Sequence, residues 1–250
     1  MFPYHDENKT LRPAVFTLLF IALNVVTWLL VQGAGLPLDL ARSVCNYGLI
    51  PGELTGMVPP GTRFPIGDGL ACVIDPGPQV SHIITSMFLH GSWMHLIGNM
   101  WFLWLFGNNV EDAMGPGRFA AFYLICGVVA ALAQVVTSPA SPIPMVGASG
   151  AISGVMGGYL VLYPHVRVYC LMLPFFATVA MPAWTMLLYW FALQFIGGLA
   201  GLAAKEGGGV AFWAHAGGFV AGLVLIKLFA RRDYLEAHRA VHWRPRSARI

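Results

Sequence analysis

Charged residues are scarce in this chain. Asp, Glu, Lys and Arg make up 10% of its 250 residues, whereas 57% are hydrophobic. A soluble domain carries about 25% charged residues, so this composition excludes an ordinary soluble globular protein. Together with a mean hydropathy of +0.68, it indicates a membrane protein that crosses the bilayer several times.

Acidic residues are absent from the long apolar segments. All eleven fall in terminal or connecting segments, namely Asp6, Glu7, Asp39, Glu53, Asp68, Asp75, Glu111, Asp112, Glu206, Asp233 and Glu236. A channel or transporter would be expected to carry buried charges, so their absence argues against that class. It also excludes a Ser–His–Asp triad inside the membrane.

Cysteine is scarce too, with four residues in the whole chain. Cys126 and Cys170 fall in or beside apolar segments and are expected to be packing residues. Cys45 and Cys72 share one long loop, where they would form a disulfide if that side of the membrane is oxidising. The sequence leaves this pairing open.

What the chain does contain is six apolar segments of roughly spanning length. They lie near residues 13–33, 87–108, 117–137, 148–163, 181–203 and 210–230. We predict an all-α membrane protein, a six-transmembrane-helix bundle, in which residues 1–250 form one membrane domain. A segment 1–12 precedes the spans at about 13–230, and a basic tail 231–250 follows them. The long first extracytoplasmic loop, 34–86, is expected to lie in the membrane interface.

Basic residues predict the topology. With six crossings, one face collects Lys9, Arg12, Arg118, Arg167 and the tail residues Arg231, Arg232, Arg239, Arg244, Arg246 and Arg249. The positive-inside rule then places both termini in the cytoplasm, and we expect a bacterial inner membrane. Arg42, Arg63 and Lys205 fall on the opposite face, so the bias is not absolute. The tail is interpreted as a membrane anchor, with no nucleic-acid partner, because no domain with interleaved aromatic residues accompanies it.

The fourth apolar segment is too short to span. From Ser149 to Tyr163 it has about 15 residues, which at about 1.5 Å per residue is well short of about 30 Å. The Pro-rich segment 138–144 must therefore dip in from the outer side. Irregular backbone at that depth is tolerated where it lines a watery cavity, so we expect a water-accessible cavity that ends at Ser149.

Ser149 lies at a predicted helix start, between Gly147 and Gly150. The first N–H groups of a helix lack intrahelical partners, and the helix dipole there favours negative charge. An oxyanion would be stabilised at this point, and the glycines would let a substrate backbone come close. The alternative is that Ser149 is an ordinary N-cap.

His215 lies in the sixth segment at a depth that matches Ser149. Small residues repeat every four positions in both segments, as Gly150, Gly154 and Gly158 in the fourth and Gly218 and Gly222 in the sixth. Such faces let helices approach closely, so the serine and the histidine should come within reach. A neutral His215 could serve as a general base or could simply be a packed histidine bonded to a carbonyl.

The second segment adds His95 and Asn99, which share one helix face at i, i+4 spacing. Both are neutral donors suited to holding an oxyanion. A metal site formed by His90, His95 and His215 is the competing hypothesis. It is disfavoured because His90 and His95 do not share a helix face and no carboxylate or cysteine lies nearby. We therefore expect no metal and no cofactor.

These motifs resemble a known family. The elements His95-x-x-x-Asn99, Gly147-Ala148-Ser149-Gly150 and Ala214-His215-x-x-Gly218-x-x-x-Gly222 occur in the order found in rhomboid intramembrane serine proteases, and the likeness covers nearly the whole chain. Glu111-Asp112, followed by Gly115 and Arg118, is similar to the family's turn after its second span.

The resemblance implies a rhomboid-type bundle and an intramembrane serine endopeptidase. Ser149 would be the nucleophile and His215 the general base, with an acyl-enzyme intermediate and the oxyanion held by His95, Asn99 and the Ser149 N–H. Supporting positions would be Gly147, Gly150, His90 and Ser153. Substrates would be transmembrane proteins, cut near the extracytoplasmic end of their helix, where helix-breaking residues and a small side chain before the scissile bond are favoured. The alternative is a proteolytically silent relative that binds transmembrane clients, although such relatives usually lack the serine or the histidine. The oligomeric state stays open.

Two positions depart from the family pattern. Ser81-His82 stands where several members have a Trp-Arg pair, which puts the anchoring of the first loop in question. Ser153 stands where some members have an aromatic ring that stacks on the histidine, and it could instead donate a hydrogen bond.

Aromatic residues in the second and fifth segments could line a lateral route for substrate helices, or they could simply face lipid. They are Trp101, Phe102, Trp104, Tyr189, Trp190, Phe191 and Phe195.

Overall fold

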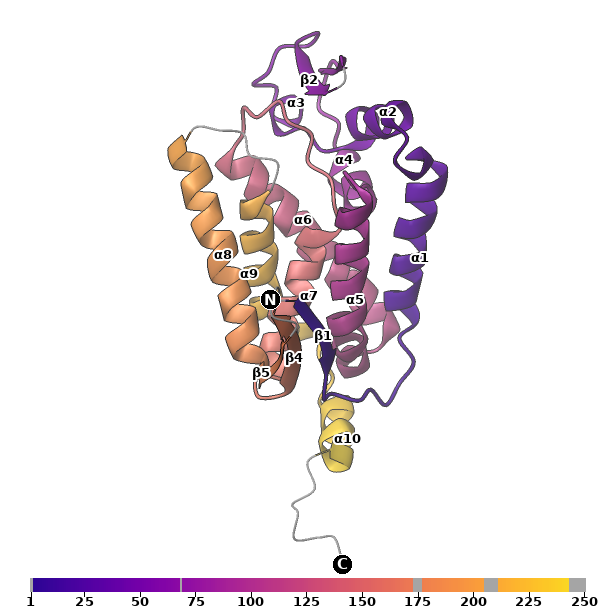
Figure 1. Ribbon diagram of the computed structural model, residues 1–250, viewed down its shortest axis with the longest axis vertical. Coiled ribbons are helices and arrows are strands. Elements are labelled where there is room, and N and C mark those ends of the chain that lie inside the picture. The colour runs from indigo at the N-terminus through magenta and orange to yellow at the C-terminus, as the bar shows by residue number, and fades with distance from the viewer. Residues whose placement is uncertain (1, 68, 173–176, 205–210, 243–250) are drawn as a thin grey trace, which may run out of the picture.

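The computed structural model describes the backbone of residues 2–67, 69–172, 177–204 and 211–242 (Figure 1). Side chains are described over the same ranges except for residues 201–204 and 242. Lys205, Glu206 and the tail arginines Arg244, Arg246 and Arg249 lie outside these residues. Within them, the long helices run side by side. They are α1 (Val15–Leu30), α5 (Trp93–Met114), α6 (Pro116–Thr137), α7 (Ser149–Leu162), α8 (Ala183–Ala204) and α9 (Phe212–Phe229).

Three of these helices are long and apolar enough to cross a membrane: α6, residues Ala183–Ala200 of α8, and α9. Two more, α1 and α7, are apolar but shorter. The molecule is thus a mostly helical membrane protein. The short fourth segment was predicted from the sequence, and α7 indeed has only 14 residues.

The second long helix is displaced from its predicted range of 87–108. It begins at Trp93 because the Ser92 hydroxyl caps it, accepting the His95 N–H at 3.1 Å. The preceding residues form α4 (His82–Thr85) and a 3-10 turn, η2 (Ser86–Phe88). The helix therefore continues to Met114 and includes six residues that were assigned to a connection.

This shift corrects the expectation that every acidic residue lies outside the predicted membrane spans. Glu111 and Asp112 are in the last turns of α5 and are only 1% and 2% exposed. Each of these buried carboxylates has hydrogen-bond or ion-pair partners. Glu111 accepts the Phe16 and Thr17 N–H groups at 2.8 Å, which caps the start of α1. Asp112 pairs with the Arg12 guanidinium at 3.1 Å.

The prediction of an all-α structure was incomplete. At the end of the bundle that carries α10 (Arg232–His242), which we call the tail end, β1 (Phe2–Asp6), β4 (Arg167–Met172) and β5 (Ala177–Pro182) form an antiparallel sheet in the order β1-β4-β5 (Figure 1). The strands β4 and β5 are short and mostly apolar, so in sequence they merge with the neighbouring helical segments.

The first strand also contacts two long helices. The carboxylate of Asp6, which is 9% exposed, accepts hydrogen bonds from the Tyr159 hydroxyl at 2.6 Å and the Asn109 amide at 3.0 Å. Tyr159 belongs to α7 and Asn109 to α5. The N-terminal strand therefore ties these helices together at the tail end.

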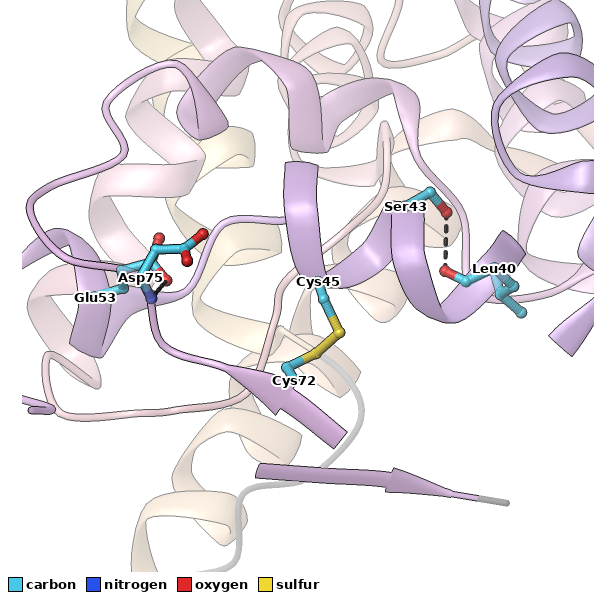
Figure 2. The surroundings of a disulfide bond; sticks show 6 residues. All are labelled: Leu40, Ser43, Cys45, Glu53, Cys72 and Asp75. Atoms are coloured by element: carbon cyan, nitrogen blue, oxygen red, sulfur yellow. Dashed lines mark hydrogen bonds between the residues drawn. A yellow bond between two sulfur atoms is a disulfide. The ribbon is translucent and has the colours of Figure 1, made fainter. Parts of the chain in front are cut away.

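The opposite end, which we call the loop end, is built from residues 33–67 and 69–88 (Figure 1). Besides α4 and η2 it holds η1 (Gly33–Gly35), α2 (Pro37–Tyr47), α3 (Pro51–Leu54) and a hairpin of β2 (Arg63–Gly67) and β3 (Leu70–Val73). Figure 2 shows the disulfide between Cys45 and Cys72 that joins α2 to β3. Cys126 and Cys170 are free and buried. The pairing that the sequence left open is therefore present.

Glu53 anchors this loop. Its carboxylate accepts the Asp75 N–H at 3.1 Å and lies 3.8 Å from the His82 imidazole. His82 is one of the two residues that stand in place of the family's Trp-Arg pair. His82 Nδ1 has no hydrogen-bond partner among the described residues, so the bond that Glu53 makes here is the one to the Asp75 N–H.

Glycines bring α7 and α9 together, as the sequence predicted. A Cβ on Gly218 would collide with the Gly150 carbonyl oxygen, and one on Gly222 with the Gly154 carbonyl oxygen. Gly158 differs, because its nearest neighbours are side chains of Ile226 and Phe122. Helix backbones can approach this closely only where no side chain intervenes.

Candidate active site

Ser149 is the first residue of α7, as predicted. The segment before it is held by the loop end. Met145 exchanges backbone hydrogen bonds of 2.7 and 3.0 Å with Leu49, and the Gly147 N–H donates to the Ser86 carbonyl at 2.9 Å. Gly147 has φ = 132°, a conformation that favours glycine. These contacts fix the irregular backbone that leads into the helix.

Ser149 and His215 are in direct contact. The His215 Nε2 atom lies 2.7 Å from the Ser149 Oγ atom. His215 is in the first turn of α9, and the glycine contacts described above set the spacing of the two helices. Both residues are only partly buried, so the pair is accessible from the cavity that it lines.

His95 and Asn99 line the same cavity, which has a volume of about 490 Å³. The Gly91 N–H donates to Nδ1 of His95 at 3.3 Å, so Nε2 carries the ring hydrogen. A Cβ on Gly147 would lie 2.9 Å from this Nε2 and 3.5 Å from the Ser149 Oγ. Asn99 is 8% exposed, and its side-chain nitrogen has no hydrogen-bond partner among the described residues. Two neutral donors thus line the cavity that Ser149 also lines.

A second cavity, of about 20 Å³, also touches Ser149. Small side chains form much of its wall, including Gly127, Ala130, Ala131, Gly150 and Ala214. A space of this size holds about one water molecule or one methyl group.

The two supporting side chains lie in different places. The His90 ring is fully buried and packs edge-on against His95, with 5.1 Å between ring centroids. The Ser153 hydroxyl donates to the Ser149 carbonyl at 2.6 Å. Ser153 therefore does not hold His215, and the expectation that it could replace the stacking ring was wrong.

The residue that does contact the far side of His215 was missed from the sequence. The Gln194 Oε1 atom, from α8, lies 2.8 Å from Nδ1 of His215. The only local signal was a single amide in an otherwise apolar segment, and polar groups inside spans deserve scrutiny. Its partner could be found only once α8 and α9 were placed side by side.

The aromatic residues that were expected to line a substrate route lie in two different places. Trp190 packs near the histidine, with ring centroids 5.8 Å apart, and it lines the large cavity together with Phe102. Trp101 instead donates to the Pro3 carbonyl at 2.7 Å, and Trp104 lines a separate cavity at the tail end. The second-segment tryptophans are therefore not part of this site.

The fold and the site together define a class of protein. It is a helical membrane protein in which a serine at a helix N-terminus is hydrogen-bonded to a histidine from a second helix. The model of the rhomboid domain matches residues 77–232, more than half of the chain. The chain belongs to the rhomboid family.

Similar proteins come from distant organisms. The chain is 33% identical over 102 residues to the human presenilin-associated rhomboid-like protein, mitochondrial, which covers 40% of this chain and 27% of that protein. It is 41% identical over 78 residues to rhomboid protease GluP of Bacillus subtilis, with 31% and 15% covered. It is 30% identical over 131 residues to rhomboid protein 1, mitochondrial, of Saccharomyces cerevisiae, with 48% and 38% covered. The chain thus matches well under half of the length of each relative.

Proposed function

We propose that this protein is an intramembrane serine endopeptidase, with Ser149 as nucleophile and His215 as general base. The observation that carries the proposal is the 2.7 Å contact between His215 Nε2 and Ser149 Oγ. A serine hydroxyl is a weak nucleophile until an adjacent base takes its proton. Family membership supports the same activity, and one relative is itself named a protease.

The reaction follows from these atoms. Ser149 Oγ attacks the carbonyl carbon of the scissile peptide bond while its proton passes to His215 Nε2. The tetrahedral intermediate collapses, the C–N bond breaks, and His215 returns the proton to the leaving amine. Water, activated by the same histidine, then hydrolyses the acyl-enzyme and frees Ser149.

The oxyanion is stabilised by groups around Ser149. The backbone N–H of Ser149 lies at the N-terminus of α7, where the helix dipole favours negative charge. The ring N–H of His95 and the unpartnered amide of Asn99 add side-chain donors from α5. Donors arranged before the reaction stabilise charge as it develops.

The substrate is a transmembrane protein that exposes an extended stretch near the end of its helix. The small cavity at Ser149, of about 20 Å³, suits a small side chain before the scissile bond. Ser149 lies at the loop-end terminus of α7, so cleavage occurs toward the extracytoplasmic side, and Gly147, Gly150 and His90 shape the surroundings.

We further propose a single membrane domain with six spans, α1 and α5 to α9, and with both termini in the cytoplasm. The loop-end disulfide supports this orientation, because disulfides persist on the oxidising side of a membrane. We propose a bacterial plasma membrane as the setting; of the relatives named above one is bacterial and two are mitochondrial. Fusion of reporter proteins to either terminus and to the hairpin β2–β3 tests the orientation.

The activity is tested with a membrane-tethered reporter cut by the full chain. Ser149→Ala and His215→Ala should each abolish cleavage at normal expression. Ser43→Ala is a matched control, since this hydroxyl lies on α2 at the loop end and donates to the Leu40 carbonyl at 2.8 Å (Figure 2). Full cleavage by Ser149→Ala would contradict the proposal. Client binding without any cleavage by the wild type would favour a silent relative.

A further inference from the structure

The histidine at the site is held by one group that lies outside the motifs quoted in the sequence analysis. Gln194 presents its amide oxygen to Nδ1 of His215 at 2.8 Å. An amide oxygen only accepts, so Nδ1 must carry the ring hydrogen. Nε2 then carries a lone pair that can accept the hydrogen of the Ser149 hydroxyl, whose oxygen lies 2.7 Å away. This is the tautomer that can accept the serine proton.

No carboxylate takes this role among the residues that the structure describes. Asp6 bonds to Tyr159 and Asn109, Glu111 caps α1, and Asp112 pairs with Arg12. Ser153 is bonded to the Ser149 carbonyl instead. Besides Gln194, the nearest ring support is Trp190, which precedes it by one helical turn on α8.

Besides Ser149, Gln194 and Trp190 contact the histidine ring, and both belong to α8, at the edge of the bundle beside α9 (Figure 1). This helix is less enclosed than its neighbours. Of the residues in the most apolar 18-residue stretch of α8, 22% are buried, against 44% in the corresponding stretch of α6 and 39% in that of α9. One face is exposed along its length, through Trp184, Leu188, Tyr189, Phe195 and Leu199.

We propose that Gln194 is the positioning residue that fixes the proton-accepting tautomer of His215, and that it makes the base competent only while α8 is in place beside α9. The inference rests on the proposed hydrolase function. Gln194 acts through His215, so it governs the chemical step and not the binding of substrate. Movement of α8 away from α9 would remove the orienting bond and the Trp190 contact together.

The test compares Gln194→Leu, Gln194→Glu and the control Gln134→Leu in the full chain, with a transmembrane substrate in detergent micelles. Gln134 is the matched amide: it lies on α6 and accepts the Ala214 N–H at 3.3 Å without touching the ring. We expect Gln194→Leu to lower kcat by roughly 10- to 100-fold with KM unchanged, by analogy with the loss of the orienting partner of a metal-bound histidine. Gln134→Leu should keep kcat within about twofold, because the Gln134 hydrogen bond goes to the Ala214 N–H and not to the histidine ring.

Gln194→Glu separates positioning from packing. A carboxylate restores the acceptor, so kcat should return to within about fivefold of the wild type. It also stabilises the protonated histidine, so the acidic limb of the kcat/KM profile should move to higher pH. Equal losses in the leucine and glutamate variants, or a leucine variant as active as the wild type, would overturn the proposal. If the wild type itself cleaves nothing, the proposed function fails first, and the two failures are thereby distinguished.

Discussion

The carbonyl oxygen of Gly154 in α7 occupies the space that a Cβ on Gly222 of α9 would need. The same relationship joins Gly150 to Gly218 one turn nearer the site. These contacts between backbones set the distance between the helix that carries Ser149 and the helix that carries His215.

Gly222→Ala should therefore destabilise the protein and reduce activity. The added methyl group meets backbone atoms that cannot rotate away, and overpacking of this kind costs about 3 kcal/mol. Thermal unfolding in detergent and reporter cleavage measure the two effects. Gly117→Ala on α6 is the control, because nothing lies within 4 Å of its added Cβ. Equal melting temperatures for the two variants would contradict close packing of α7 on α9.

Asn99→Ala should slow the chemistry without unfolding the protein. If its amide donates to the oxyanion, kcat should fall by about 10²- to 10³-fold while KM changes little. Asn108→Ala, nine residues later on the same helix and at the tail end, should leave kcat within about twofold. An unchanged kcat in Asn99→Ala would remove this residue from the proposed oxyanion site.

Asp6 should make stability depend on pH. Burial raises the pKa of Asp6 to about 6, against the opposing effect of the Tyr159 hydrogen bond. The folded state then holds a proton that the unfolded state releases near pH 3.8. This contribution is fully present below about pH 4 and is lost as pH rises through about 6, for a total of about 3 kcal/mol.

The measurement is the melting temperature between pH 4 and 8. Asp6→Asn should flatten the fall, whereas Asp233→Asn, with a side chain 61% exposed, should follow the wild-type curve. A wild-type profile identical to that of Asp6→Asn would show that the carboxyl is not perturbed by its surroundings.

The Cys45–Cys72 disulfide should stabilise the loop end. It closes a loop with a sequence separation of 27 residues, which corresponds to about 3.5 kcal/mol of chain entropy. Peptide mapping without reductant should recover the linked pair, and reductant should lower the melting temperature of the wild type. The Cys45→Ser, Cys72→Ser double variant should already melt lower and show no response to reductant. Reductant sensitivity in that variant would point to a different bond.

Much of the site was predictable from the sequence because its elements are local. The short apolar segment after a Pro-rich stretch predicted a helix that starts at Ser149, and the glycine spacing predicted its contact with the helix of His215. Both follow from rules of length and side-chain size that need no tertiary information.

The remainder depended on contacts between distant residues. Glu111 and Asp112 can be buried in the last turns of α5 because distant groups pair with their carboxylates. These groups are the Arg12 guanidinium and the Phe16 and Thr17 N–H groups. The strand β1 exists because β4 lies beside it. No local pattern distinguishes Gln194 from any other amide until the histidine is placed 2.8 Å away.

The central claim is that Ser149 is an activated nucleophile, and one measurement addresses it directly. A fluorophosphonate probe forms a stable bond to a serine oxygen only when a base has activated it. Full-length protein is labelled in micelles, digested, and mapped by mass spectrometry, with His215→Ala as the comparison. The account predicts the adduct on Ser149 in the wild type and none in His215→Ala. An adduct on another serine, or labelling of Ser149 that persists without His215, would contradict it.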